Sequence, residues 1–116
     1  MTRQRQALGK HGEDLAVAEL ERRGYAVLAR RYRTRHGEID VVARDGETIV
    51  FVEVKAKVTA EFGTAAEAVT PRKQRRVASM AVEYLARHRL TARPCRFDVV
   101  AIDAGVVTVF ASAFAL

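Results

Sequence analysis

Apolar positions along the chain follow two different spacings. Over residues 9–23 and 70–88 they recur every three or four positions, which predicts two amphipathic helices. Short runs rich in valine, isoleucine and phenylalanine predict five strands, at residues 25–32, 37–43, 48–55, 97–102 and 106–111. The order helix, three strands, helix, two strands indicates the α/β class, with a mixed central β-sheet flanked by helices in a single domain over residues 1–116.

Local signals set the ends of these elements. Gly24 follows the first helix as a stop, and Thr70 and Pro71 open the second helix as N-cap and first helical residue. Asp45 and Gly46 lie between two strand-like runs and are typical of a two-residue hairpin turn. We therefore expect an antiparallel hairpin with this turn at its centre.

The hairpin turn fixes which side chains share a face of the sheet. Asp40 falls opposite Phe51, and directly opposed residues of an antiparallel pair point to the same side. Glu53 and Lys55 follow Phe51 at two-residue steps, so they point to that side as well. The diagonal from Asp40 to Glu53 should span roughly 7–8 Å between backbones, which lets both carboxylates reach one metal ion.

Two acids and a lysine on one face suit the hydrolysis of phosphodiester bonds. Mg²⁺ and Mn²⁺ prefer oxygen ligands, and Mg²⁺ commonly takes only one or two carboxylates. Such an ion polarises a phosphoryl oxygen and activates water, and a lysine can stabilise the charge that develops. The alternative is an ion pair of Lys55 with Glu53 or Asp40 at the strand end, without catalysis.

The charge of the chain points to a polyanionic partner. A net charge of +6 over 116 residues favours nucleic acid first, and the alternative is a basic protein with no such partner. Four cations lie at the start of the second helix, where the helix dipole disfavours positive charge. A bound phosphate would offset this repulsion. The alternative is that these cations form only a solvated face. These cations are Arg72, Lys73, Arg75 and Arg76. Arg31 and Arg33 flank Tyr32 and either grip a nucleic-acid backbone or guard an edge strand.

Three other acids need partners. Glu13 falls in the first turn of the predicted first helix, where the helix dipole favours a carboxylate. Glu38 shares the face of Asp40 and is either an outer ligand or the ion-pair partner of an arginine. Asp98 is expected at a sheet edge, paired with an arginine.

The segments from Gly37 to Asp40 and from Val52 to Lys55 together resemble the paired motifs of the YraN-like family of uncharacterised bacterial proteins. That family is similar to the PD-(D/E)xK nucleases, which share the restriction-endonuclease-like fold. Phe62-Gly63 and the segment from Lys73 to Arg76 extend the likeness, which covers most of the chain. Departures from the family pattern are Arg31 where asparagine is common, and Lys57 where arginine is usual.

The resemblance implies roles for individual residues. Asp40 and Glu53 would be ligands of Mg²⁺ or Mn²⁺, and Lys55 would be the catalytic lysine. Glu13 matches the family's additional acidic residue, and Gln74 could project toward the metal, as a glutamine on the equivalent helix does in some related nucleases.

These features predict a metal-dependent endonuclease-like protein that hydrolyses phosphodiester bonds in DNA, which is favoured over RNA, with branched or single-stranded DNA as candidate substrates. The alternative is a non-catalytic nucleic-acid-binding module that retains the nuclease fold, and a third reading is a protein-interaction subunit. A homodimer is compatible with each. The single cysteine, the lack of a signal peptide and the lack of a membrane-spanning apolar run favour the cytoplasm, with no membrane partner.

Overall fold

The structure, a computed structural model, describes residues 3–56 and 69–115 and therefore leaves out Lys57 and Phe62-Gly63. The described chain contains two helices and five strands in the predicted order. The helices are α1 (Arg3–Arg22) and α2 (Pro71–Arg87). The strands are β1 (Ala26–Thr34), β2 (Gly37–Asp45), β3 (Thr48–Lys55), β4 (Cys95–Asp103) and β5 (Val106–Phe114). No helix in this part of the chain is long and apolar enough to cross a membrane.

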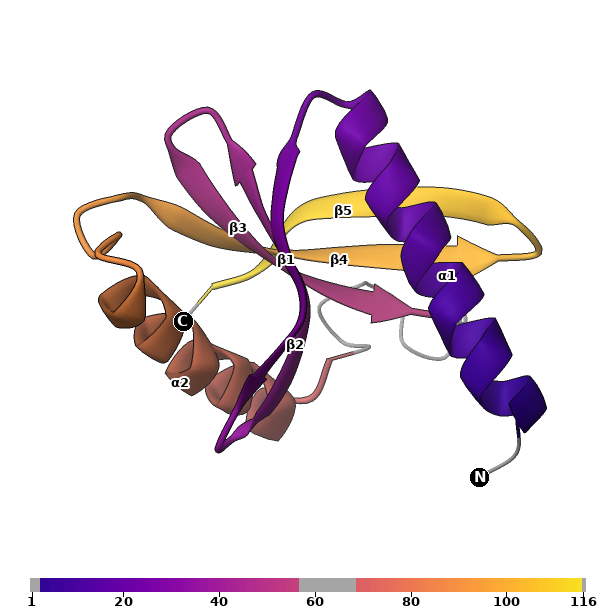
Figure 1. Ribbon diagram of the computed structural model, residues 1–116, viewed down its shortest axis with the longest axis horizontal. Helices are drawn as coiled ribbons and strands as arrows, with labels where there is room; N and C mark the ends of the chain where they lie inside the picture. Colours follow the sequence, from indigo (N-terminus) through magenta and orange to yellow (C-terminus); the bar gives the residue numbers. More distant parts are fainter. Residues whose placement is uncertain (1–2, 57–68, 116) are drawn as a thin grey trace.

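The strands form one mixed sheet in the order β1-β2-β3-β4-β5, in which β3 and β4 run parallel and the other neighbours run antiparallel. The parallel pair needs a crossover, and α2 lies within it. Figure 1 shows α1 and α2 on opposite sides of this twisted sheet. The prediction of a mixed sheet flanked by helices is confirmed.

Both faces of the sheet are covered by apolar side chains, as the near-continuous apolar run of β3 requires. Val41, Val50 and Val100 belong to the core cluster shared with α1, whereas Phe51 and Val99 belong to the cluster shared with α2. Alternate residues of β3 thus enter two different cores. Each helix holds one face of the hairpin in place.

The first helix begins earlier than predicted, at Arg3, because its polar first turns carry no apolar period to mark them. It ends where expected: Gly24 adopts a φ of 92°, and Tyr25 N–H donates to the Leu20 carbonyl. Glu13 therefore lies in the middle of α1. The prediction that it lies in the first turn is wrong, and the helix dipole does not account for this acid.

The second helix begins as predicted. The Thr70 side chain accepts a hydrogen bond from Lys73 N–H at 3.2 Å, and Pro71 occupies the first turn. The inner stripe of Val77, Met80 and Tyr84 is buried against the sheet. This cap sets the start of α2 and thereby the position of Lys73 in its first turn.

The hairpin turn lies one residue later than predicted. Asp45 pairs with Thr48, so Gly46 and Glu47 form the turn in place of Asp45 and Gly46. Val42, and not Asp40, lies opposite Phe51. The register moves by an even number of positions, so Val42, which replaces Asp40 opposite Phe51, lies in the same core cluster as Phe51.

Asp98 is fully buried on β4, which is an interior strand, so its predicted place at a sheet edge is wrong. Its predicted pairing with an arginine is confirmed: Arg96 Nε donates to Asp98 Oδ1 at 3.1 Å. Arg96 also bonds Asp45 and the Tyr25 hydroxyl, and Ser112 N–H donates to Asp98. This network joins β2, β4, β5 and the segment after α1.

Candidate functional site

The hairpin brings Asp40 and Glu53 together. The paired register of β2 and β3 ends at Val41 and Val52, the residues next to the two acids. Asp40 Oδ2 accepts a hydrogen bond of 2.8 Å from the backbone N–H of Val54, the residue directly after Glu53. The first acid is thus anchored on the strand that carries the second.

The β1–β2 ribbon turns over at the position of Asp40. Ile39 and Val42 both enter the core cluster shared with α2, although residues three apart on a regular strand face opposite sides. Ala29 and Tyr32 on β1 repeat this arrangement. Arg31, between them, has a φ of 51°, which is uncommon for a residue with a side chain.

This reversal sends two consecutive arginines to one acid on α1. Arg30 Nε donates to Glu13 Oε1 at 3.0 Å, and Arg31 Nε donates to Glu13 Oε2 at 2.9 Å. Arg30 also bonds Asp14. Glu13 is buried, and both of its carboxylate oxygens are bound to arginine. The two arginines supply the partners that a buried carboxylate requires.

The environment of Asp40 favours its protonated form. Burial and the negative charge of Glu53 raise the pKa of Asp40 from 3.8 to about 7, and the charge of Glu13 acts in the same direction. The Val54 N–H and the positive charge of Lys73 lower the pKa and offset part of this effect. The pKa of Asp40 is therefore raised by acids on both faces of the sheet, Glu53 and Glu13.

Two lysines contact one oxygen of Glu53. The Nζ of Lys55, from β3, lies 3.7 Å from Glu53 Oε1, and the Nζ of Lys73, from α2, lies 3.5 Å from the same atom. Glu53 is only 8% exposed, so these ion pairs are shielded from solvent on one side. Lys55 was predicted here, whereas Lys73 was predicted only as a phosphate contact.

The carboxylate pair fits a divalent cation in donor chemistry. Asp40 and Glu53 offer the hard oxygens that Mg²⁺ and Mn²⁺ prefer, and one or two carboxylates suffice for Mg²⁺. A cation there would offset the repulsion that disfavours a charged Asp40. No group of three or more His, Cys, Asp or Glu side chains suited to a metal occurs within residues 3–56 and 69–115. Glu13 would have to leave its arginines before it could join the pair.

Comparison with known proteins identifies the family. A model of the uncharacterised protein family UPF0102 matches residues 12–102. This chain belongs to the UPF0102 family. A UPF0102 protein of Geobacter sulfurreducens is 52% identical over 95 residues, which cover 82% of this chain and 74% of the relative. A UPF0102 protein of Ralstonia pickettii is 48% identical over 112 residues, which cover 93% of this chain and 90% of the relative.

The family assignment confirms the resemblance to the YraN-like proteins. The UPF0102 match extends from Gly12 on α1 to Ile102 on β4. It therefore includes Asp40, Glu53 and Lys55 as well as the whole of α2. The family description names no activity.

Three of the predicted phosphate contacts lie on the surface at the start of α2, the helix whose Lys73 contacts Glu53. Arg72, Arg75 and Arg76 are exposed at the start of α2. A side-chain carbon built on Gly37 would lie 3.6 Å from Arg76 Cδ, so the β1–β2 turn packs against this end of α2. Arg33 is exposed on β1, and its neighbour Tyr32 is the residue that packs in the cluster shared with α2.

Two polar residues predicted near the site have identified partners. Glu38 Oε2 lies 3.4 Å from Arg33, which confirms the ion-pair alternative for Glu38. The Gln74 amide donates to the Val69 carbonyl at 2.9 Å, so it stabilises the entry to α2. A role for Gln74 at a metal stays a prediction.

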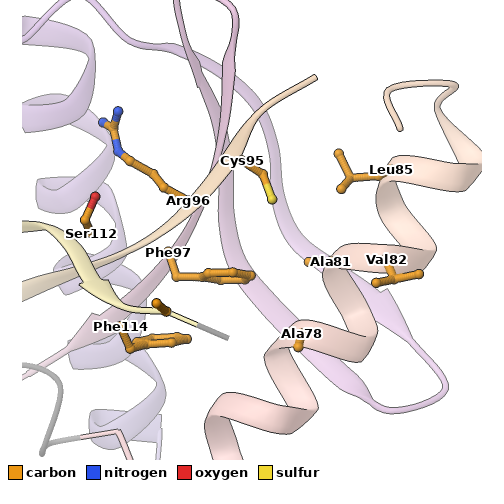
Figure 2. Close-up of a pocket in the computed structure, with 10 residues that line it drawn as sticks. Ala78, Ala81, Val82, Leu85, Cys95, Arg96, Phe97, Ser112 and Phe114 are labelled. Atoms are coloured by element: carbon orange, nitrogen blue, oxygen red, sulfur yellow. The ribbon is translucent and has the colours of Figure 1, made fainter. Parts of the chain in front are cut away.

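A separate apolar groove of about 520 Å³ lies between α2 and the β4–β5 pair. Figure 2 shows the rings of Phe97 and Phe114 along the sheet side of this groove, with Val82 and Leu85 across from them. The Arg96 guanidinium points away from α2. The groove lacks the carboxylates and lysines of the candidate site.

Proposed function

We propose that this protein is a metal-dependent nuclease of the PD-(D/E)xK type, with a restriction-endonuclease-like fold, that hydrolyses phosphodiester bonds in DNA. One observation carries the proposal. Asp40 and Glu53 converge on the hairpin with Lys55 Nζ 3.7 Å from Glu53, beside the basic start of α2.

Each residue has a chemical task in this proposal. Asp40 and Glu53 hold Mg²⁺ or Mn²⁺, and the bound ion supplies Lewis-acid activation of the phosphodiester and of water. The Val54 N–H holds Asp40 in place, so little reorganisation is required of that carboxylate. Lys55 is placed to orient water or to stabilise charge on the phosphoryl group.

The basic surface positions the substrate. Arg72, Arg75 and Arg76 are exposed on the same helix start as Lys73, which contacts Glu53, and can bind phosphates that flank the scissile bond. Arg31 Nε is bonded to Glu13, so only the rest of the Arg31 guanidinium is left to bind phosphate. Such contacts follow the backbone and do not read sequence, which suits a substrate recognised by its shape.

The proposal is tested with linear, single-stranded and branched DNA incubated with Mg²⁺ or Mn²⁺. Cleavage should require the metal and fall by roughly 10²-fold or more in Glu53→Ala and in Lys55→Ala. The matched control is Glu21→Ala, because Glu21 is exposed on α1. Cleavage that persists in both site variants would remove the assignment.

The second candidate is a nucleic-acid-binding module without turnover. It is favoured by the observation that lysines and arginines already compensate the acids: Glu53 by Lys55 and Lys73, and Glu13 by Arg30 and Arg31. Equal DNA affinity in chelator and in Mg²⁺, with no cleavage of any substrate in the panel, would support this reading over the nuclease.

A further inference from the structure

Lys73 has an unusual place for a cation. It lies in the first turn of α2, where the helix dipole disfavours positive charge, and its backbone N–H is already used by the Thr70 cap. Its ammonium lies 3.5 Å from Glu53 Oε1. Glu53 thus compensates for an unfavourable charge at the helix start.

Glu53 has a second lysine at the same oxygen. Lys55 Nζ lies 3.7 Å from Glu53 Oε1. Glu53 would therefore keep a positive partner if Lys73 were removed. Both lysines are about one-third exposed, whereas the Glu53 side chain is nearly buried. Their charges therefore concentrate on a carboxylate that solvent screens weakly.

We propose that Lys73 is a built-in counter-ion that competes with the divalent cation for Glu53, a proposal that rests on the metal site of the proposed function. A cation that binds Glu53 must overcome repulsion from the Lys73 ammonium or displace it. The four-carbon stem and partial exposure of Lys73 give the ammonium a route to solvent or to a bound phosphate.

This assignment gives Lys73 a different role from its neighbours. Arg72 is exposed and directly precedes Lys73. Replacing Arg72 by a neutral residue removes the same formal charge as replacing Lys73. It therefore reports the general effect of surface charge on metal affinity. A difference between the two positions isolates the direct contact with Glu53.

The experiment measures Mn²⁺ binding alone, by titration calorimetry on the full chain at pH 8. Lys73→Met should bind Mn²⁺ about tenfold more tightly than the wild type, whereas Arg72→Met should change the affinity by less than about twofold. Lys73→Arg keeps the charge and should bind nearly as the wild type does. Circular dichroism of each variant checks that it is folded, and Lys73→Gln replaces Lys73→Met if the latter is not.

Equal gains in Lys73→Met and Arg72→Met would overturn the counter-ion assignment and leave the metal site intact. Weaker Mn²⁺ binding in Lys73→Met would overturn it too. If neither the wild type nor Lys73→Met binds Mn²⁺, both this inference and the metal site of the proposed function fail. Binding by Lys73→Met alone would support the inference in its strongest form.

Discussion

The backbone N–H of Val54 donates a 2.8 Å hydrogen bond to Asp40 Oδ2. This bond joins β2 to β3 beyond the last paired position of the hairpin, where the ribbon with β1 turns over. It holds half-buried Asp40 beside buried Glu53. The hairpin thereby maintains two like charges in a place where they disfavour one another.

The raised pKa of Asp40 predicts a pH-dependent stability in chelator. The folded protein binds this proton more tightly than the unfolded chain, because the pKa is about 7 in place of 3.8. The associated stability is full below about pH 4 and is lost as the pH rises through 7. Asp40→Asn should therefore be more stable than the wild type at pH 8, by on the order of 2 kcal/mol.

Urea unfolding at pH 5 and pH 8 measures this difference. Asparagine can accept the same hydrogen bond from Val54, so the variant removes the charge and keeps the contact. Glu21→Gln, at an exposed position of α1, is the control. An advantage of Asp40→Asn that is the same at both pH values would contradict the prediction.

A divalent cation should stabilise the folded protein. Mn²⁺ at about 100 times its dissociation constant should add roughly 2.7 kcal/mol to the free energy of unfolding, because the unfolded chain does not preform the acid pair. Thermal melts with Mn²⁺ and with chelator measure the shift. Glu53→Gln should abolish it, and a shift of equal size in that variant would place the ion elsewhere.

Loss of Arg96 should destabilise the fold strongly. Arg96→Met leaves the carboxylate of Asp98 buried without its charged partner, which costs about 3–5 kcal/mol. Arg93→Met breaks an ion pair with Glu47, whose side chain is 82% exposed, and should cost less than about 1 kcal/mol. Urea unfolding at pH 7 compares the two, and similar losses would argue against the buried network.

The start of α2 should dominate the salt dependence of DNA binding. If Arg72, Arg75 and Arg76 each contact a phosphate, replacing one of them by alanine should lower the slope of log K against log salt by about 0.7–0.9. Fluorescence anisotropy in chelator measures the slope without cleavage. Arg22→Ala, at the far end of α1 and paired with Glu19, should leave it unchanged; an equal loss there would indicate diffuse attraction only.

Much of the fold follows from local sequence. The spacing of Val77, Met80 and Tyr84 and the Thr70 cap predict α2 correctly, and Gly24 ends α1 as expected. The predicted hairpin turn is one residue too early, yet Asp40 and Glu53 come together as expected. Because side chains alternate with a period of two, a shift of the register by two positions does not change which residues of β2 and β3 face the same side.

The candidate site was less predictable where distant elements meet. Arg30 and Arg31 would face opposite sides in a regular strand, so their joint contact with Glu13 could not be inferred from alternation. Lys73 reaches Glu53 only because the crossover returns α2 to the end of β3. The cap at Thr70 signals where the helix starts but not what the helix start lies against.

The parallel pairing of β3 with β4 places α2, which carries Lys73, after the hairpin in the chain. Asp40 and Glu53 are joined by a tight hairpin, which can close from local contacts, whereas Lys73 arrives only when α2 has crossed the sheet. In a chain growing from its N-terminus, both acids emerge before α2 can deliver the second ammonium. On the proposed function, a divalent cation would meet only the Lys55 ammonium at Glu53 during that interval.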